Sequence, residues 1–203
     1  SFWHFDENNK PTMEYCIEKA AKMGFDGIEF LLVQMSSTEQ SHLQVLKRKA
    51  FHAGLDIMGL STHQGFLNPS KDYRDENIKK TINQIEIAYN LGIPTMRINT
   101  GRWGTSESFD ALMKNKGIEP PINGFKEEDG FPWVIDSIKK CIPTAEKCGV
   151  VLGLENHWGL GISAKNVKKI IDDINSPWLR ATLDTGNFLE DRDQQIKTLA
   201  PYA

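Results

Sequence analysis

The chain has 203 residues, of which 39% are hydrophobic and 25% charged, and its formal net charge is −3. These values are typical of one soluble globular domain with a sizeable core, and they exclude the basic excess of a nucleic-acid-binding protein. No apolar run approaches the roughly 20 residues of a membrane span, and the first residues lack the pattern of a signal peptide. We therefore expect a cytoplasmic protein with reduced cysteines, since its three cysteines show no CxxC spacing.

Amphipathic stretches along the chain repeatedly end at a glycine that a short apolar run follows. The glycines are Gly24, Gly54, Gly92 and Gly149. Glycine takes the left-handed conformation past the end of a helix most readily, so each stretch is predicted to be a helix and each run a strand. Helices that alternate with short strands are typical of βαβ units in a parallel sheet.

In chain order, this pattern predicts six strands. They are expected at residues 2–5, 26–31, 55–62, 95–99, 150–155 and 180–184. A sixth helix is expected at 191–199, after which residues 201–203 would lead into a seventh strand. Residues 101–130 show no clear periodicity, and their length and their place after a strand indicate a functional loop or lid.

The predicted strands have one apolar and one polar face. Alternation places Arg97 and Asn99 on one side of their strand, opposite the apolar residues. An apolar outer face under helices and polar inner strand ends are what a TIM barrel requires, whereas an open doubly wound sheet buries both faces. We therefore predict an α/β fold of the TIM (β/α)8 barrel type, with about six βα units in a single domain over residues 1–203.

Six strands of an eight-stranded barrel would expose two unpaired edges and part of the core. We therefore expect that the domain is incomplete at its C-terminal end, or that a partner or a swapped segment closes it. A homo-oligomer is one form that such closure would take.

Glu155 and Asp184 are the leading candidates for chemistry, because each ends one of two successive apolar runs. Acids at the carboxyl ends of neighbouring parallel strands point into the mouth where ligands bind, so the pair indicates a metal site or acid–base chemistry. The structural alternatives are a loop ion pair, a helix cap, or an Asx turn of Asp184 with Gly186.

Three segments resemble the xylose isomerase-like TIM barrels, namely residues 27–30 (GIEF), 154–157 (LENH) and 183–187 (LDTGN). That superfamily includes sugar phosphate isomerases and epimerases, ketose 3-epimerases, inosose dehydratases and the endonuclease IV group. The resemblance implies a divalent metal, Mn²⁺ or Mg²⁺ first and Zn²⁺ or Co²⁺ as alternatives, bound by Glu, Asp, His and Glu.

By the same resemblance, Glu155 and Asp184 match the first two metal ligands, and the His and second Glu ligands are expected beyond Ala203. Asn187 stands where many relatives have a histidine. An asparagine is a poor metal ligand and does not titrate, but it still binds a hydroxyl group.

The other candidates are residues that would touch a substrate. His63, His157 and Asn187 would hold hydroxyl groups, and Trp103 and Trp158 would either stack on a sugar or cover the core. His4 would contact substrate or lie near the barrel floor. Glu29 would act in the site or form a buried ion pair with Arg97 or another base.

The functional hypothesis is a metal-dependent isomerase or epimerase of a sugar, sugar phosphate or polyol that works through an enediolate. Glu155 would be both a metal ligand and the proton carrier, and Asp184 a ligand only. The alternatives are an endonuclease IV-like metal-dependent hydrolase and a non-catalytic sugar-binding barrel. No nucleotide-binding glycine motif is present, and neither nucleic acid nor a membrane is expected as a partner.

Overall fold

The computed structural model describes residues 10–203, so the predicted strand 2–5 and His4 lie outside the described residues. The strands are β1 (Gly27–Leu31), β2 (Asp56–Ser61), β3 (Thr95–Ile98), β4 (Val151–Glu155) and β5 (Leu179–Thr182). The helices are α1 (Met13–Lys22), α2 (Gln40–His52), α3 (Lys71–Leu91), α4 (Phe109–Lys114), α5 (Glu127–Cys148), α6 (Ala164–Ile174) and α7 (Arg192–Leu199), with the 3₁₀ turns η2 (Leu32–Gln34), η3 (Gly159–Ile162) and η4 (Ala200–Tyr202).

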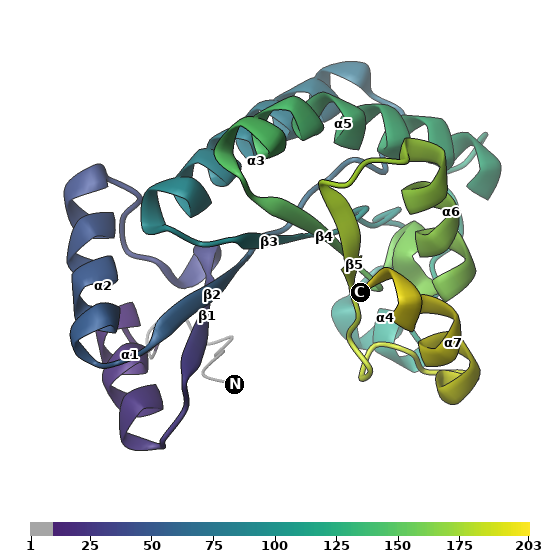
Figure 1. Ribbon diagram of the computed structural model, residues 1–203. Helices are drawn as coiled ribbons and strands as arrows, with labels where there is room; N and C mark the ends of the chain where they lie inside the picture. The colour runs from purple at the N-terminus through teal and green to yellow at the C-terminus, as the bar shows by residue number, and fades with distance from the viewer. Residues whose placement is uncertain (1–9) are drawn as a thin grey trace.

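All neighbouring strands pair in parallel, and their order in the sheet, β1-β2-β3-β4-β5, is their order in the chain. A doubly wound sheet reverses its strand order at a switch point, and the described sheet has no such reversal. The strands instead form an arch with α1, α2, α3, α5 and α6 on its convex side (Figure 1). This is the arrangement of part of a TIM barrel, as predicted.

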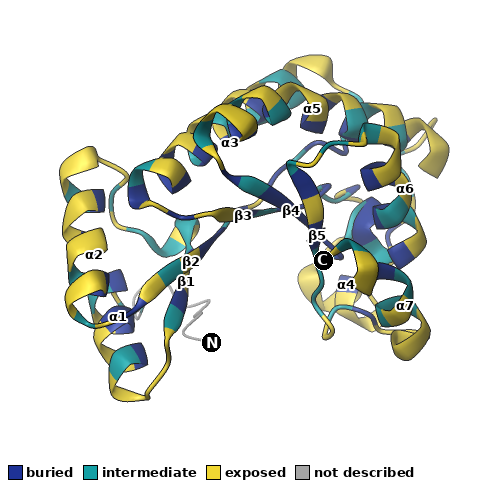
Figure 2. Ribbon diagram, viewed as in Figure 1, coloured by how far each residue is buried: buried dark blue, intermediate teal, exposed yellow. Residues whose placement is uncertain are grey.

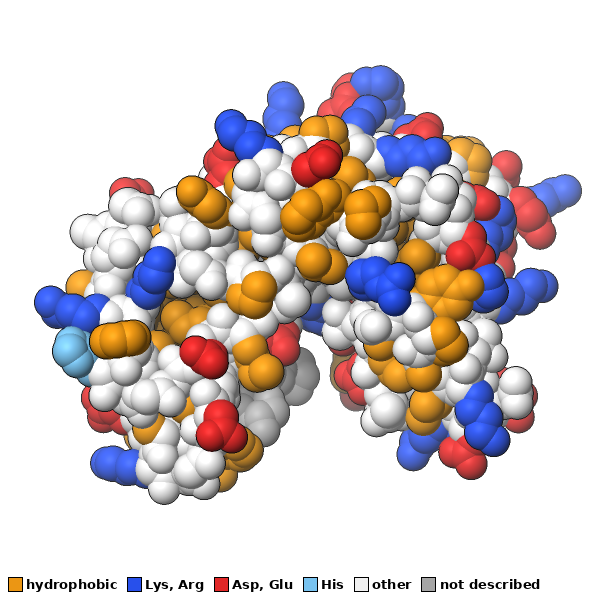
Figure 3. Space-filling model, viewed as in Figure 1, with side chains coloured by type: hydrophobic (Ala, Val, Ile, Leu, Met, Phe, Trp, Pro, Cys, Tyr) orange, Lys and Arg blue, Asp and Glu red, His pale blue; other side chains and the backbone are white. Residues whose placement is uncertain are grey.

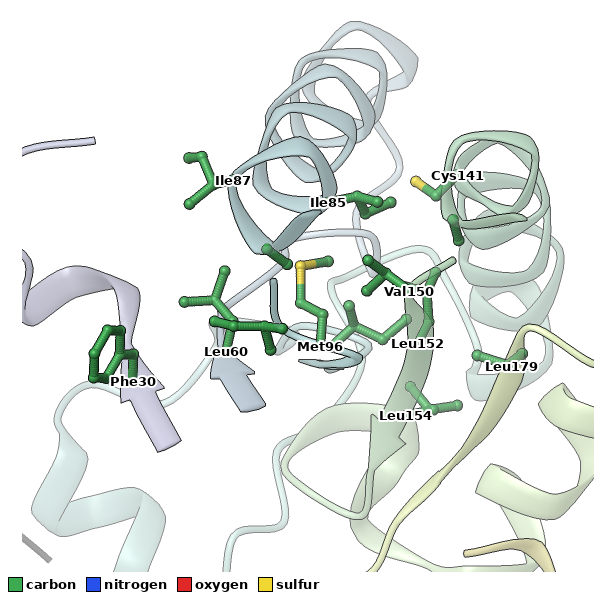
Figure 4. Close-up of a cluster of buried hydrophobic side chains, with 14 of the residues drawn as sticks. Phe30, Leu60, Ile85, Ile87, Met96, Cys141, Val150, Leu152, Leu154 and Leu179 are labelled. Atoms are coloured by element: carbon green, nitrogen blue, oxygen red, sulfur yellow. The ribbon is translucent and has the colours of Figure 1, made fainter. Parts of the chain in front are cut away.

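The core lies between the sheet and these outer helices. Phe30, Leu60, Met96 and Leu152 project from four successive strands and are fully buried. They meet helix residues such as Ile85 of α3 (Figure 4). Each helix presents its buried side to the sheet and its exposed side to solvent (Figure 2).

Glycines end helices where the sequence predicted them. Gly92 after α3 and Gly149 after α5 have φ values of 75° and 67°, and their backbone N–H groups donate back to the last turn of each helix. L-residues with a Cβ rarely adopt this conformation, so the glycines stop the helices and direct the chain into β3 and β4.

The segment 101–130 contains more regular structure than its sequence indicates. It holds α4, whose six residues begin after the N-cap Ser108, and the first residues of α5. Six residues are too few to show a helical period. The predicted helix 191–199 is α7, and residues 200–202 form the 3₁₀ turn η4.

Cys16, Cys141 and Cys148 are free cysteines, and the first two are buried. None of the helices in residues 10–203 has both the length and the apolar character that a membrane span requires.

Candidate active site

A cavity of about 830 Å³, called the first cavity below, runs along β1 and the buried side of α1 and reaches the carboxyl ends of β2, β3, β4 and β5. Glu29 of β1, Ser61 of β2, Arg97 of β3, Glu155 of β4 and Asp184 after β5 all line it. The space-filling view shows the molecule hollowed on the concave side of the arch (Figure 3). The polar strand ends that the sequence placed on one face therefore converge in one cavity.

Glu155 and Arg97 form an ion pair in this cavity. Arg97 Nη1 lies 2.5 Å from Glu155 Oε2, and the two side chains are only 11% and 8% exposed. Burial raises the pKa of Glu155, the charge and hydrogen bond of Arg97 oppose that rise, and the charges of Asp184 and Glu29 add to it. The charge of Arg97 therefore favours the ionised form of Glu155, while burial favours the protonated form.

Glu29 has Ser61, and not Arg97, as its side-chain partner. Arg97 pairs with Glu155, and Glu29 accepts a hydrogen bond from the hydroxyl of Ser61 on the neighbouring strand. Adjacent strands bring Glu29 and Ser61 together, whereas Arg97 of β3 faces its other neighbour, β4.

Arg97 also contacts His63, with 3.3 Å between Nη2 and Nε2. A guanidinium group only donates, so His63 accepts at Nε2 and carries its ring proton on Nδ1. Burial and the charge of Arg97 lower the pKa of His63, which keeps the ring neutral. Arg97 Nε is buried and has no hydrogen-bond partner among the described residues, so one strong donor inside the site is unused.

Asn156 holds the Asp184 loop against the end of β4. Its Nδ2 donates to the Asp184 carbonyl and its Oδ1 accepts from the Asp184 N–H, each at 2.7 Å. Asn187 Nδ2 donates to the Asn156 carbonyl at 3.0 Å. Because Asn156 is 1% exposed, these hydrogen bonds are shielded from water. They hold Asp184 in place at the end of β4, next to Glu155.

The Asx turn considered for Asp184 is present. The Gly186 N–H donates to Asp184 Oδ1 at 2.7 Å. This bond uses one carboxylate oxygen and orients the side chain, and Asp184 still lines the first cavity. The structural and functional interpretations of Asp184 are therefore compatible.

A second cavity, of about 790 Å³, adjoins the first, and His63 lines both. Asn99, His157 and Trp158 belong to this second cavity. Strand β4 ends at Glu155, so His157 does not follow the direction of Glu155 and lines only the second of these two cavities. Burial, with the charge of Arg97 second, lowers the pKa of His157 to about 3.

The predicted substrate residues thus fall into three groups. His63 and His157 line cavities, while Asn187 lines neither and binds Asn156. Trp103 is 6% exposed and packs in the core against Trp133, with ring centroids 6.3 Å apart. Of the two tryptophans that were candidates for stacking, Trp158 is the one that lines a cavity.

Sequence reasoning missed the roles of Arg97 and Asn156. Alternation had placed Arg97 on the polar face, which was a signal for the site but not for its partner. Asn156 follows Glu155 directly, and nothing in its local pattern indicates a bond to a residue that is 28 positions away.

Glu155 and Asp184 are the two acidic residues from the sequence prediction that could contribute to a divalent metal site. Both carboxylates line one cavity, and the negative charge of Asp184 acts on Glu155, a repulsion that a cation relieves. The residues that the structure describes bring no third His, Cys, Asp or Glu close enough to complete such a site.

Solved structures with the same fold include enzymes that act on sugars. D-psicose 3-epimerase from Clostridium cellulolyticum H10 superposes with a TM-score of 0.72 and 19% identity, over 93% of this chain and 64% of that one. A 3-keto-D-glucoside 4-epimerase from E. coli has a TM-score of 0.71 and 16% identity, over 98% of this chain and 72% of that one. This chain therefore spans less than two thirds of the psicose epimerase, and identities this low show the fold alone.

The IOLI protein, whose structure holds a zinc atom, has a TM-score of 0.69 and 16% identity, over 93% of this chain and 63% of that one. No curated protein sequence matches the chain. The model of one family, described as xylose isomerase-like TIM barrel, matches residues 17–202. With the parallel strands in chain order and the acidic strand ends in one cavity, this match shows that the chain belongs to the xylose isomerase-like TIM barrel family.

Proposed function

We propose that the first cavity binds a sugar or related polyol, and that the chain acts in its isomerisation or epimerisation by proton transfer. The observation that carries the proposal is Glu155, a buried carboxylate with a raised pKa that lies at a barrel strand end and is paired with one guanidinium group. The similar epimerase structures agree with this class of reaction.

In the proposed mechanism, the Glu155 carboxylate accepts the proton on the carbon next to the substrate carbonyl, which leaves an enediolate. In an isomerisation, Glu155 returns the proton to the neighbouring carbon. In an epimerisation, a second acid, which would come from outside the described residues, delivers a proton to the opposite face of the same carbon. A raised pKa suits this role, because a carboxylate that is more basic than usual accepts a carbon-bound proton more readily.

Arg97 and His63 would act on the oxygen atoms of the substrate. Arg97 lines the first cavity with its guanidinium group, and hydrogen-bond donors that face a developing oxyanion stabilise it strongly where water is excluded. His63 is neutral and already accepts from Arg97, so its Nδ1–H remains to bind a hydroxyl group.

We include a divalent metal ion, Mn²⁺ or Mg²⁺ before Zn²⁺ or Co²⁺, in this proposal. Glu155 and Asp184 are the described residues that would hold it, with further ligands from outside the described residues. When bound, the ion would polarise the carbonyl and hydroxyl oxygens of the substrate.

The test is the substitution Glu155→Gln, which keeps the shape of the side chain and removes its basicity. Wash-in of solvent deuterium is measured in heavy water across a panel of ketoses, aldoses, their phosphates and polyols, together with bound metal by elemental analysis. We expect exchange to fall roughly 10²–10⁴-fold and metal content to fall with it. The exposed Glu146→Gln variant on α5 is the matched control.

An active, metal-replete Glu155→Gln variant would contradict the assignment of Glu155. Release of cleaved products without deuterium wash-in would favour a hydrolase, and sugar binding without either reaction would favour a binding barrel. Each outcome replaces the proposed function with a specific alternative.

A further inference from the structure

The second cavity is an unassigned feature as large as the first. Its volume is about 790 Å³, against about 830 Å³ for the first, and His63 forms part of both walls. Each volume falls within the range of about 300–1,000 Å³ that holds small ligands. A single sugar ring at Glu155 would therefore leave the adjoining cavity without an occupant.

The second cavity offers no free positive charge. Arg102 is the only Lys or Arg among the described residues that line it, and its guanidinium donates from Nε and Nη2 to Glu119 at 3.1 and 2.7 Å. The Glu119 side chain is 0% exposed, so this pairing is sheltered. Free Arg and Lys side chains are common in phosphate sites, and the described lining of this cavity has none, which favours an uncharged group.

Aromatic rings and one free amide line the same cavity. Trp158 packs so closely on Gly117 that an added Cβ there would lie 2.5 Å from its ring, and Tyr73 packs on Gly65 in a similar way, at 2.7 Å. These close approaches hold the rings in place. The His157 ring also lies against Trp158, with ring centroids 4.7 Å apart, so it is the remaining exposed part of the indole that lines the cavity. An aromatic surface attracts the slightly positive C–H groups on the apolar face of a sugar ring.

Asn99 supplies the polar contact. It is 4% exposed, and its Oδ1 accepts from the Gln64 N–H at 3.1 Å while its own N–H donates to Gln64 Oε1 at 3.0 Å. These bonds fix the amide orientation and leave Nδ2 without a partner in residues 10–203. An amide donor in a cavity wall can donate to a hydroxyl or ring oxygen of a ligand.

We propose that the second cavity is a subsite for a second, uncharged sugar ring, so that the substrate is a glycoside and not a free or phosphorylated monosaccharide. The reacting ring lies by Glu155, the glycosidic link passes His63, and the second ring lies against Trp158 and Asn99. The identity of the reacting ring rests on the proposed function above, and the occupancy of the second cavity does not.

The test measures binding by calorimetry on the full chain. The probes are cellobiose, maltose and lactose, their component monosaccharides, and glucose 6-phosphate. We expect one disaccharide or more to bind at least tenfold more tightly than its components, and glucose 6-phosphate to bind no more tightly than glucose. Trp158→Ala should remove this gain and leave monosaccharide binding unchanged, Trp158→Phe should retain most of it, and Tyr89→Ala, an exposed aromatic on α3, should change nothing.

The subsite is overturned if the phosphate raises affinity, if no disaccharide gains affinity, or if Trp158→Ala weakens both classes equally while circular dichroism shows a folded chain. Disaccharide preference without deuterium wash-in would overturn the proposed function and leave the subsite. Deuterium wash-in with monosaccharides, without any preference for disaccharides, would overturn the subsite and leave the proposed function.

Discussion

Arg97 is the residue on which the charge balance of the first cavity depends. Among the described residues that line that cavity it is the only Lys or Arg, and it faces the carboxylates of Glu29, Glu155 and Asp184. Removal of one partner from a buried ion pair leaves the other charge uncompensated, which usually costs about 3–5 kcal/mol.

We therefore expect Arg97→Gln to lower the free energy of unfolding by about 3–5 kcal/mol at neutral pH. Burial and the charges of Asp184 and Glu29 then act on Glu155 without opposition, so its pKa rises further. Protonation of Glu155 removes the buried charge, so the difference in free energy of unfolding between wild type and variant should shrink as the pH falls. Urea unfolding at several pH values measures this.

Arg180→Gln on β5, where Arg180 is exposed, is the matched control and should cost little. The double variant Arg97→Gln, Glu155→Gln should recover part of the stability, because neither charge remains. Equal effects of Arg97→Gln and Arg180→Gln would show that the ion pair contributes nothing.

At the scale of elements, Glu119 holds together the segment that follows β3. Its carboxylate accepts from Arg102 and from the backbone N–H groups of Ser106 and Gly104. Burial raises the pKa of Glu119, but Arg102 and the two N–H groups outweigh it and bring the pKa to about 2, from 4.5. A shift of this size corresponds to about 3 kcal/mol in favour of the closed segment.

We expect Glu119→Gln to lower the free energy of unfolding by about 3 kcal/mol at pH 7, or to speed amide exchange at Ser106 and Gly104 if the segment opens locally. The folded pKa is depressed, so the contribution is present above pH 4.5 and is lost as the pH falls toward 2. The gap between wild type and variant should close over that window. Glu107→Gln, exposed in the same segment, is the control, and a pH-independent gap would contradict the ion-pair explanation.

At the scale of the whole molecule, the sheet is an arch of five described strands that does not close on itself. Within residues 10–203, β5 pairs only with β4, so its other edge presents free backbone N–H and C=O groups. Such an edge is a template for pairing with another strand. The expectation that a partner or a swapped segment closes the barrel therefore remains a prediction.

We expect the 203-residue chain to self-associate as its concentration rises, which sedimentation velocity measures directly. The expected result is a dimer fraction that grows with concentration. A single monomeric species at every concentration would show that this edge is protected within one chain.

Much of the fold follows from local patterns. Apolar residues at spacings of two and of three to four, with glycines between them, predicted the five described strands and the helices that cover them. The helix α4 was missed, because a single turn and a half carries no periodic signal. Strand alternation predicted the direction of Glu155, which ends β4. It did not predict the positions of Asp184 and His157, because β5 ends at Thr182 and β4 ends before His157.

The sequence by itself determined the class of fold, the polar face of the strands and the position of Glu155 at a strand end, because alternation and helical period are properties of neighbouring residues. Only the tertiary structure decided that Arg97 pairs with Glu155, that Asn156 locks Asp184, and that Trp158 lines a cavity while Trp103 lies in the core. These contacts join residues far apart in the chain, and they depend on how adjacent strands align and where each strand ends. No local pattern encodes that information.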